Sequence, residues 1–177
     1  PTDVLVLESQ NTLALILQAT GRLREAEAIF REILKYRDVL RPQDHLETAV
    51  LSNLGAVYGE LGDLSSAEKL LREAVDLRRV RLGPDHPRLA LALARLATVL
   101  CDAGRLDEAE AAARESLAIR QKVFGPANRE VGRTWIQLAE IVRGRGEIAR
   151  ADEFLTRAAS MHLDGAEGAE LLYQRGL

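Results

Sequence analysis

Apolar residues recur at intervals of three and four along much of this chain, which is the spacing of one face of an α-helix. One such stripe occupies residues 51–61 and a second occupies residues 64–74. Gly62 lies between the stripes, and glycine adopts the left-handed conformation that ends many helices at little energetic cost. The pattern therefore predicts two amphipathic helices that reverse direction at Gly62.

The segment around Gly62 has three counterparts elsewhere in the chain. Glycine opens the segments "GRLREAE", "GDLSSAE", "GRLDEAE" and "GEIARAD" at positions 21, 62, 104 and 146. Successive copies are separated by 41, 42 and 42 residues, and a fixed period of this length indicates a protein built of stacked repeats. Each repeat of such an array buries its apolar face mainly against its neighbours.

Proline-containing turns separate the repeats. The prolines at positions 42, 84 and 126 stand 42 residues apart in the segments "LRPQDH", "LGPDHP" and "FGPANR". Proline cannot continue a preceding helix, and a following Asp or Asn side chain can accept a hydrogen bond from the first turn of the next helix. We expect Asp44, Asp85 and Asn128 to provide these helix caps.

These boundaries predict a single array over residues 1–177 with four repeats, at residues 3–40, 44–82, 86–124 and 128–163. Residues 166–177 have the pattern of one more helix, which either caps the array or begins a truncated fifth repeat. Because the chain starts at Pro1 rather than at methionine, we expect it to be a piece of a longer protein. Its usage of Ala, Leu and Arg favours a bacterial source with a GC-rich genome.

Aligned on the repeated glycine, the four copies share a first-helix leucine, a small residue directly after it and an early second-helix alanine. The leucines are Leu13, Leu54, Leu96 and Leu138, the small residues are Ala14, Gly55, Ala97 and Ala139, and the alanines are Ala26, Ala67, Ala109 and Ala151. This pattern resembles the tetratricopeptide repeat (TPR) over roughly residues 8–162, and the 42-residue period resembles the longer variant found in kinesin light chains and in bacterial multidomain proteins. Gln10 departs from the large apolar residue usual three positions before the leucine, which suggests a frayed first repeat.

The resemblance implies an all-α fold, a right-handed superhelical solenoid of antiparallel helix pairs whose first helices line a concave groove. It also implies a non-catalytic interaction module that holds a peptide segment of another protein in that groove. The residues expected to contact the peptide are Asn11, Asn53, Arg95, Thr98, Arg133, Gln137, Glu140 and Arg143. The alternative is a structural spacer or oligomerisation array within a larger protein, which an exposed apolar face around residues 171–177 would favour.

The charges among these candidates decide which kind of peptide is expected. Members of the resembled family carry paired Asn before the leucine, and here only Asn11 and Asn53 match, while Arg95 replaces a neutral amide. With Arg133 and Arg143 nearby in the fourth repeat, Arg95 would form a basic pocket suited to an acidic or C-terminal carboxylate-bearing segment. The competing interpretation is that these arginines pair with carboxylates of the same helices, namely Asp102, Glu130 and Glu140.

Composition narrows the function further. A formal net charge of −3 and a pI near 5.7 argue against a nucleic-acid partner.

The three histidines, His45, His86 and His162, lack metal-ligand spacing and are expected in turns or caps, so we expect no metal and no cofactor. Neither a signal peptide nor an apolar segment long enough for a membrane stands out, and the single Cys101 fits a reducing compartment, so a cytoplasmic location is expected. No nucleophile, acid or base constellation indicates an enzyme.

Overall fold

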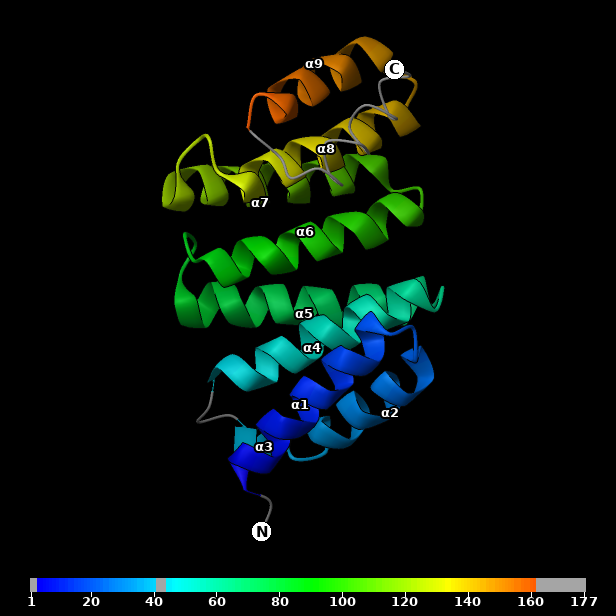
Figure 1. Ribbon diagram of the computed structural model, residues 1–177, viewed down its shortest axis with the longest axis vertical. Coiled ribbons are helices and arrows are strands. Elements are labelled where there is room, and N and C mark those ends of the chain that lie inside the picture. The colour runs from blue at the N-terminus through cyan, green and yellow to red at the C-terminus, as the bar shows by residue number, and fades with distance from the viewer. Residues whose placement is uncertain (1–2, 41–43, 162–177) are drawn as a thin grey trace. The chain divides into compact units, whose positions relative to one another are not determined.

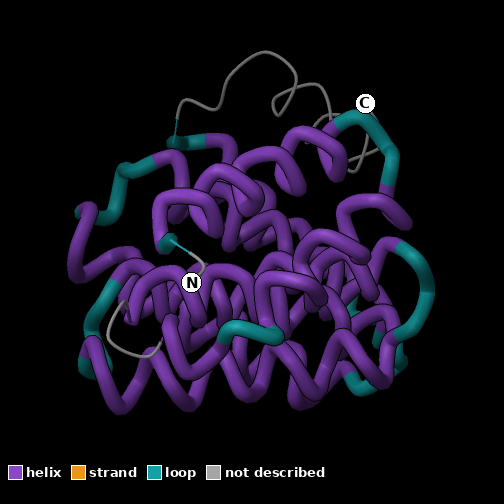
Figure 2. Tube along the Cα trace, turned by 90° about the horizontal axis from the view of Figure 1, so that it is seen from below, coloured by secondary structure: helices purple, strands orange, loops and turns teal. Residues whose placement is uncertain are grey.

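The computed structural model describes residues 3–40 and 44–161. Contacts divide the chain into two compact units, residues 1–81 and residues 82–177, here called the N-terminal half and the C-terminal half. Every described element in either half is a helix, and short turns connect the helices (Figure 1 and Figure 2). The all-α fold predicted from the sequence is therefore confirmed.

The helices follow one another in pairs, as the repeated glycine predicts. The N-terminal half contains α1 (Val4–Ala19), α2 (Leu23–Leu34), a short α3 (Arg37–Leu40), α4 (Asp44–Glu60) and α5 (Leu64–Leu82). The C-terminal half contains α6 (Pro87–Asp102), α7 (Leu106–Phe124), α8 (Arg129–Gly144) and α9 (Ile148–Ala159). The helix expected at 166–177 lies outside the described residues.

The glycine that opens each repeated segment ends the preceding helix in the left-handed conformation. The four glycines have φ values of 77°, 82°, 73° and 82° in chain order. In the first repeat the amide of Arg22 then donates to the carbonyl of Leu17 at 2.8 Å, and the third repeat makes the same bond from Arg105 to Leu100. These bonds satisfy helix-end carbonyls and let the chain reverse within a few residues.

The helix caps agree with the sequence in one case and differ in another. Asn128 caps α8 by accepting a hydrogen bond from the amide of Glu130 at 2.8 Å, as expected. At α6 the cap is His86, whose Nδ1 accepts from the amide of Arg88 at 3.1 Å. Asp85 instead pairs with Lys122 of α7, so its expected capping role is wrong. The imidazole lies one residue nearer the helix and occupies the capping position first.

Small residues allow close helix approach, as the repeated pattern predicts. A Cβ atom added to Gly55 of α4 would lie 2.8 Å from Cγ of Leu71 in α5, nearer than carbon atoms pack. Leu71 is itself fully buried, so it has little room to move. The second-helix alanines Ala67 and Ala109 are also fully buried.

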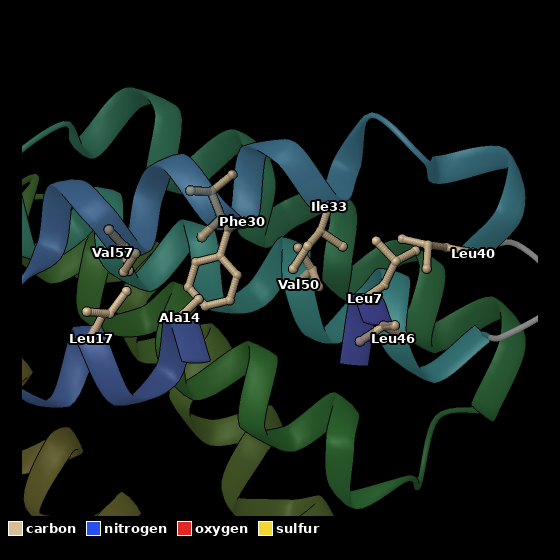
Figure 3. Packing of buried hydrophobic residues seen from close by; sticks show 11 residues of the cluster. Leu7, Ala14, Leu17, Phe30, Ile33, Leu40, Leu46, Val50 and Val57 are labelled. Carbon is tan, nitrogen blue, oxygen red and sulfur yellow. The ribbon is translucent and has the colours of Figure 1, made fainter. Parts of the chain in front are cut away.

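Phe30 of α2 occupies the centre of the apolar core of the N-terminal half (Figure 3). The core is formed by residues of α1, α2, α3 and α4, namely Leu7, Ala14, Leu17, Ala26, Phe30, Ile33, Leu40, Leu46, Val50, Leu54 and Val57. The second repeat therefore packs its first helix, α4, against both helices of the first repeat. This is the neighbour-against-neighbour burial expected of a stacked array.

Trp135 fills the core between α8 and α9. Its ring centroid lies 5.2 Å from that of Phe154, and the Arg157 guanidinium lies 4.9 Å from the indole centroid. Only 7% of the Trp135 surface is exposed, so this residue is part of the core. Because it is the only tryptophan in the chain, its fluorescence reports on the C-terminal half alone.

A nearly buried carboxylate, Glu110 of α7, joins the third and fourth repeats. It accepts a hydrogen bond from Arg114 of its own helix at 2.7 Å and contacts Arg145 and Arg150 of the fourth repeat, each at 2.6 Å. Burial raises the pKa of Glu110, but the three guanidinium groups outweigh it and lower the pKa to about 2. Arg145 and Arg150 lie 35 and 40 residues after Glu110 in the sequence, so no local spacing indicates this link.

A second carboxylate, Glu47 of α4, has the same role in the N-terminal half. Its oxygens accept from Arg37 of α3 at 2.5 Å and from Arg81 at the end of α5 at 2.8 Å, and only 1% of the residue is exposed. Burial raises the pKa of Glu47, while the hydrogen bonds from Arg37 and Arg81 lower it and prevail. Glu47 therefore holds the short α3 and the end of α5 against α4.

Ala109→Leu should lower the unfolding free energy of the C-terminal half by about 2 kcal/mol, because three extra carbons must enter a fully packed site on α7. Urea denaturation followed by Trp135 fluorescence measures this change. Ala111→Leu on the exposed side of the same helix is the matched control and should leave the midpoint nearly unchanged. Equal midpoints for the two variants would show that the alanine position does not control helix packing.

Candidate functional site

A shallow depression of about 330 Å³ lies between α6 and α8 in the C-terminal half. Five of the eight residues predicted to contact a peptide line it, namely Arg95, Thr98, Arg133, Gln137 and Glu140. They come from the first helices of the third and fourth repeats. The apolar parts of its wall are Leu91, Ala94 and Ile136. The structure thus brings most of the predicted residues to one place.

Gln137 connects the two helices that border the depression. Its Nε2 donates to the Ala94 carbonyl at 2.7 Å and to Thr98 Oγ1 at 2.8 Å, both on α6. The amide donors of Gln137 and the hydroxyl of Thr98 therefore hold α8 against α6. The remaining polar atom, Gln137 Oε1, accepts no hydrogen bond from any residue that the structure describes, so it can accept from a ligand amide.

Arg120 contributes a buried positive charge to the depression, and sequence reasoning missed it. It comes from the second helix α7 and donates through Nη1 to the Glu130 carbonyl at 2.9 Å and to Thr134 Oγ1 at 2.8 Å. Burial lowers the pKa of Arg120, since its side chain is only 8% exposed, while Glu130 raises it and Arg133 lowers it. A hint existed in the sequence, because Arg78 stands 42 residues earlier in the second repeat and is also buried.

Carboxylates of the chain itself also reach the depression. Arg133 pairs with Glu130 at 2.8 Å one turn away, and both side chains are about two-fifths exposed. Exposed pairs of this kind contribute roughly 0–1 kcal/mol and exchange partners easily. The interpretation that the arginines pair within the helices thus holds for Arg133, but such a pair does not prevent a ligand carboxylate from competing.

Arg143 stands apart from the other predicted arginines. It is exposed near the end of α8, and it is not among the residues that line the depression. Two helical turns separate it from Ile136, so it lies farther along α8 than the wall of the depression extends. The structure therefore groups Arg95 with Arg133 and Arg120 rather than with Arg143.

The two predicted asparagines lie in the N-terminal half, where they bind one another. Nδ2 of Asn53 in α4 donates to Oδ1 of Asn11 in α1 at 3.3 Å. Gln18 of α1 donates to Glu60 of α4 at 2.5 Å, and His45 lies 3.4 Å from Glu8, so three polar contacts join these helices. Asn53 is only 7% exposed, which leaves little of its amide for a ligand, whereas Asn11 is half-buried.

Cys101 is half-buried in α6, and burial raises the pKa of its thiol, with Asp102 and Glu140 acting in the same direction. A thiol with a raised pKa is a poor nucleophile. Within residues 3–40 and 44–161 no three His, Cys, Asp or Glu side chains gather as a metal site would need, and none of the helices there is long and apolar enough to span a membrane. His162 lies outside the described residues.

Comparison with known proteins places these observations in a family. The model of the tetratricopeptide repeat matches residues 5–79, 47–122 and 88–164. A comparison with curated protein sequences found no match. Among solved structures, BtubC (BKLC) from P. vanneervenii is similar with a TM-score of 0.78 and 24% identity over 88% of this chain, and the chain spans 61% of that protein.

A kinesin light chain-type protein from Podosopora anserina with nearly identical TPR-like repeats is similar to the same degree. Its TM-score is 0.78 at 22% identity, and the match covers 96% of this chain and 87% of that protein. A variant of that protein with one substitution gives a TM-score of 0.76 at 22% identity, with 95% and 92% covered. These similarities confirm the expected fold class, a solenoid of kinesin light chain-like repeats.

Proposed function

Because the chain belongs to the tetratricopeptide repeat family, we propose that it is an interaction module whose α6–α8 depression holds an acidic segment of a partner protein. TPR folds generally serve as non-catalytic scaffolds for binding other proteins or peptides. The observation that carries the acidic preference is the convergence of Arg95, Arg120 and Arg133 from three different helices on one depression.

The chemistry of the depression suits a carboxylate with backbone attached. Guanidinium groups bind carboxylates through two parallel hydrogen bonds. The buried Arg120 adds a positive charge that solvent screens little, although it also lies 3.5 Å from the Glu130 carboxylate. Gln137 Oε1 can accept from a backbone amide of the same segment, and Ile136 and Leu91 offer apolar contact beside it. We therefore assign Arg95 and Arg133 to the ligand carboxylate and Gln137 to the ligand backbone.

Reversing the charge of both arginines tests this assignment. A library of random peptides with free C-termini is displayed, selected on the immobilised chain, and the recovered peptides are measured by fluorescence anisotropy. We expect peptides rich in Asp and Glu with affinities on the order of micromolar, since a linear segment must be ordered on binding. Arg95→Glu combined with Arg133→Glu should weaken binding at least about tenfold, because the charge-assisted hydrogen bonds to the ligand carboxylate are lost.

Arg143→Glu is the matched control, because it makes the same reversal on α8 outside the depression. Its peptide affinity should stay within about twofold of that of the parent chain, because changing one exposed charge has a small effect. Circular dichroism should show equal helicity for all variants. Selection of neutral or basic peptides, or equal loss of affinity from Arg143→Glu, would contradict the proposal.

A further inference from the structure

The carboxylate of Glu130 lies in the α6–α8 depression, where a ligand carboxylate would bind under the proposed function. Glu130 belongs to the first turn of α8 and lines the depression. One of its oxygens, Oε1, lies 2.8 Å from Nη1 of Arg133, and the other, Oε2, lies 3.5 Å from Nη2 of Arg120. A single carboxylate of the chain itself thus faces two of the three arginines that converge on the depression.

The surroundings of Glu130 are held in place without its carboxylate. Arg120 donates through Nη1 to the Glu130 backbone carbonyl at 2.9 Å and to Thr134 Oγ1 at 2.8 Å, so the guanidinium is fixed by other acceptors. The amide of Glu130 donates to Asn128 Oδ1 at 2.8 Å, which fixes the start of α8. The Glu130 side chain is 37% exposed, so it can rotate into solvent while both arginines stay in the depression.

The N-terminal half shows what a structural carboxylate looks like beside the same arginine position. Arg37 and Arg120 each stand 16 residues after the repeated glycine. Arg37 pairs at 2.5 Å with Glu47, whose side chain is only 2% exposed and bonds to a second arginine at 2.8 Å. Glu130 is far more exposed and lies farther from Arg120. Removing a partner from a buried pair is costly, whereas an exposed pair exchanges partners easily.

The pair of Glu130 and Arg133 is not part of the packing pattern that the repeats share. Aligned on the repeated glycine, the position of Glu130 holds Leu5, Leu46 and Arg88 in the earlier repeats, and that of Arg133 holds Glu8, Ala49 and Leu91. The combination occurs in the fourth repeat alone, whose first helix borders the depression. Helix packing in the other repeats therefore does without it.

We propose that Glu130 is an internal competitor that holds the position of the ligand carboxylate in the free chain and is displaced when an acidic segment binds. The inference rests on the function proposed for the depression and names a residue that sets its affinity. Only the fraction of chains in which Glu130 has left the arginines can accept a ligand carboxylate between them. The apparent affinity is reduced by that fraction.

Glu130→Gln tests the inference, because it removes the internal charge and keeps an oxygen that can accept from Arg133 or Arg120. The probe is a fluorescein-labelled oligoglutamate peptide with a free C-terminus, titrated with protein and followed by fluorescence anisotropy. The variant should bind this probe about fivefold more tightly than the parent chain, since the exposed pair no longer competes. In an Arg133→Gln background the gain should fall below about twofold, because the shorter competing contact is already lost.

Glu108→Gln is the matched control. Glu108 lies in the first turn of α7 and pairs at 2.6 Å with Arg105 three residues away, but it does not line the depression. This variant removes the same charge from the C-terminal half and should change the probe affinity by less than about twofold. Urea denaturation followed by Trp135 fluorescence should give both glutamine variants midpoints close to that of the parent chain, which excludes altered folding.

The outcomes separate this inference from the proposed function. If the parent chain binds the probe and Glu130→Gln binds it no more tightly, the internal competitor is overturned while the proposed function stands. Equal gains from Glu130→Gln and Glu108→Gln, or an undiminished gain in the Arg133→Gln background, would show an effect of net charge and overturn it as well. If neither the parent chain nor any variant binds the probe, the proposed function fails and the inference falls with it.

Discussion

Replacing Phe30 with alanine should lower the unfolding free energy of the N-terminal half by about 4 kcal/mol. Phe30 has no exposed surface and is surrounded by core residues of α1, α2 and α4 (Figure 3). Truncation removes most of an aromatic side chain from water-free packing and leaves a cavity that helices on three sides cannot fill without moving. The first and second repeats share this core, so both should lose stability together.

Hydrogen exchange resolved by mass spectrometry is the measurement, since it reads each helix separately. Faster exchange should appear in α1, α2 and α4 together, because all three contact the same core. Phe124→Ala is the matched control, since that phenylalanine is 43% exposed at the end of α7, and its effect should stay within about 1 kcal/mol. If exchange increased in α2 alone, the core would not couple the two repeats as described.

Acidification should destabilise the C-terminal half through Glu110. The pKa of this carboxyl is lowered to about 2 in the folded chain, below the 4.5 of a free glutamate. A carboxyl with a lowered folded pKa adds stability above its unfolded pKa, and this stability is lost as pH falls toward the folded pKa. We expect a loss of up to about 3 kcal/mol between pH 5 and pH 2 from this group.

Glu110→Gln isolates that contribution from other carboxylates, including Glu47. The variant should be less stable than the parent at pH 7, and the difference in unfolding free energy should shrink steadily between pH 5 and pH 2. Urea denaturation followed by Trp135 fluorescence measures both chains, since Trp135 lies in the same half. Glu153→Gln, which removes an exposed partner of Arg157, is the control and should show little pH-dependent difference. A constant difference for Glu110→Gln across this range would contradict the assignment.

The features that could be predicted from the sequence are those that repeat. The glycine turns, the helix pairs and the buried small residues each depend on a local sequence feature that recurs in all four repeats. Aligning the repeats with one another therefore reveals these features without a second sequence. Gln10 shows the limit of that comparison. It breaks the repeated pattern and was expected to fray the first repeat, yet α1 is a regular helix from Val4 to Ala19. The buried Gln10 Oε1 nevertheless has no hydrogen-bond partner among the described residues.

The features that could not be predicted depend on contacts between residues about 40 positions apart whose side chains differ from repeat to repeat. Arg145 reaches Glu110 across 35 residues, while Ala103 and Leu61 occupy the position of Arg145 in the two preceding repeats. No periodic signal marks such a contact. Arg120 was not predicted for another reason. Charged residues are mostly solvent-exposed in proteins, yet the long Arg120 side chain reaches between helices to the depression.

The polar contacts between neighbouring first helices have a consequence for how this chain evolves. Apolar faces tolerate many neighbours, but the amide pair of Asn11 and Asn53 and the bonds from Gln137 to α6 each need one particular partner. A duplicated or transposed repeat would keep its leucines covered while separating these amides from their hydrogen-bond partners. These paired contacts therefore favour one order of the repeats, and recombination between repeats should be selected against wherever it separates a pair.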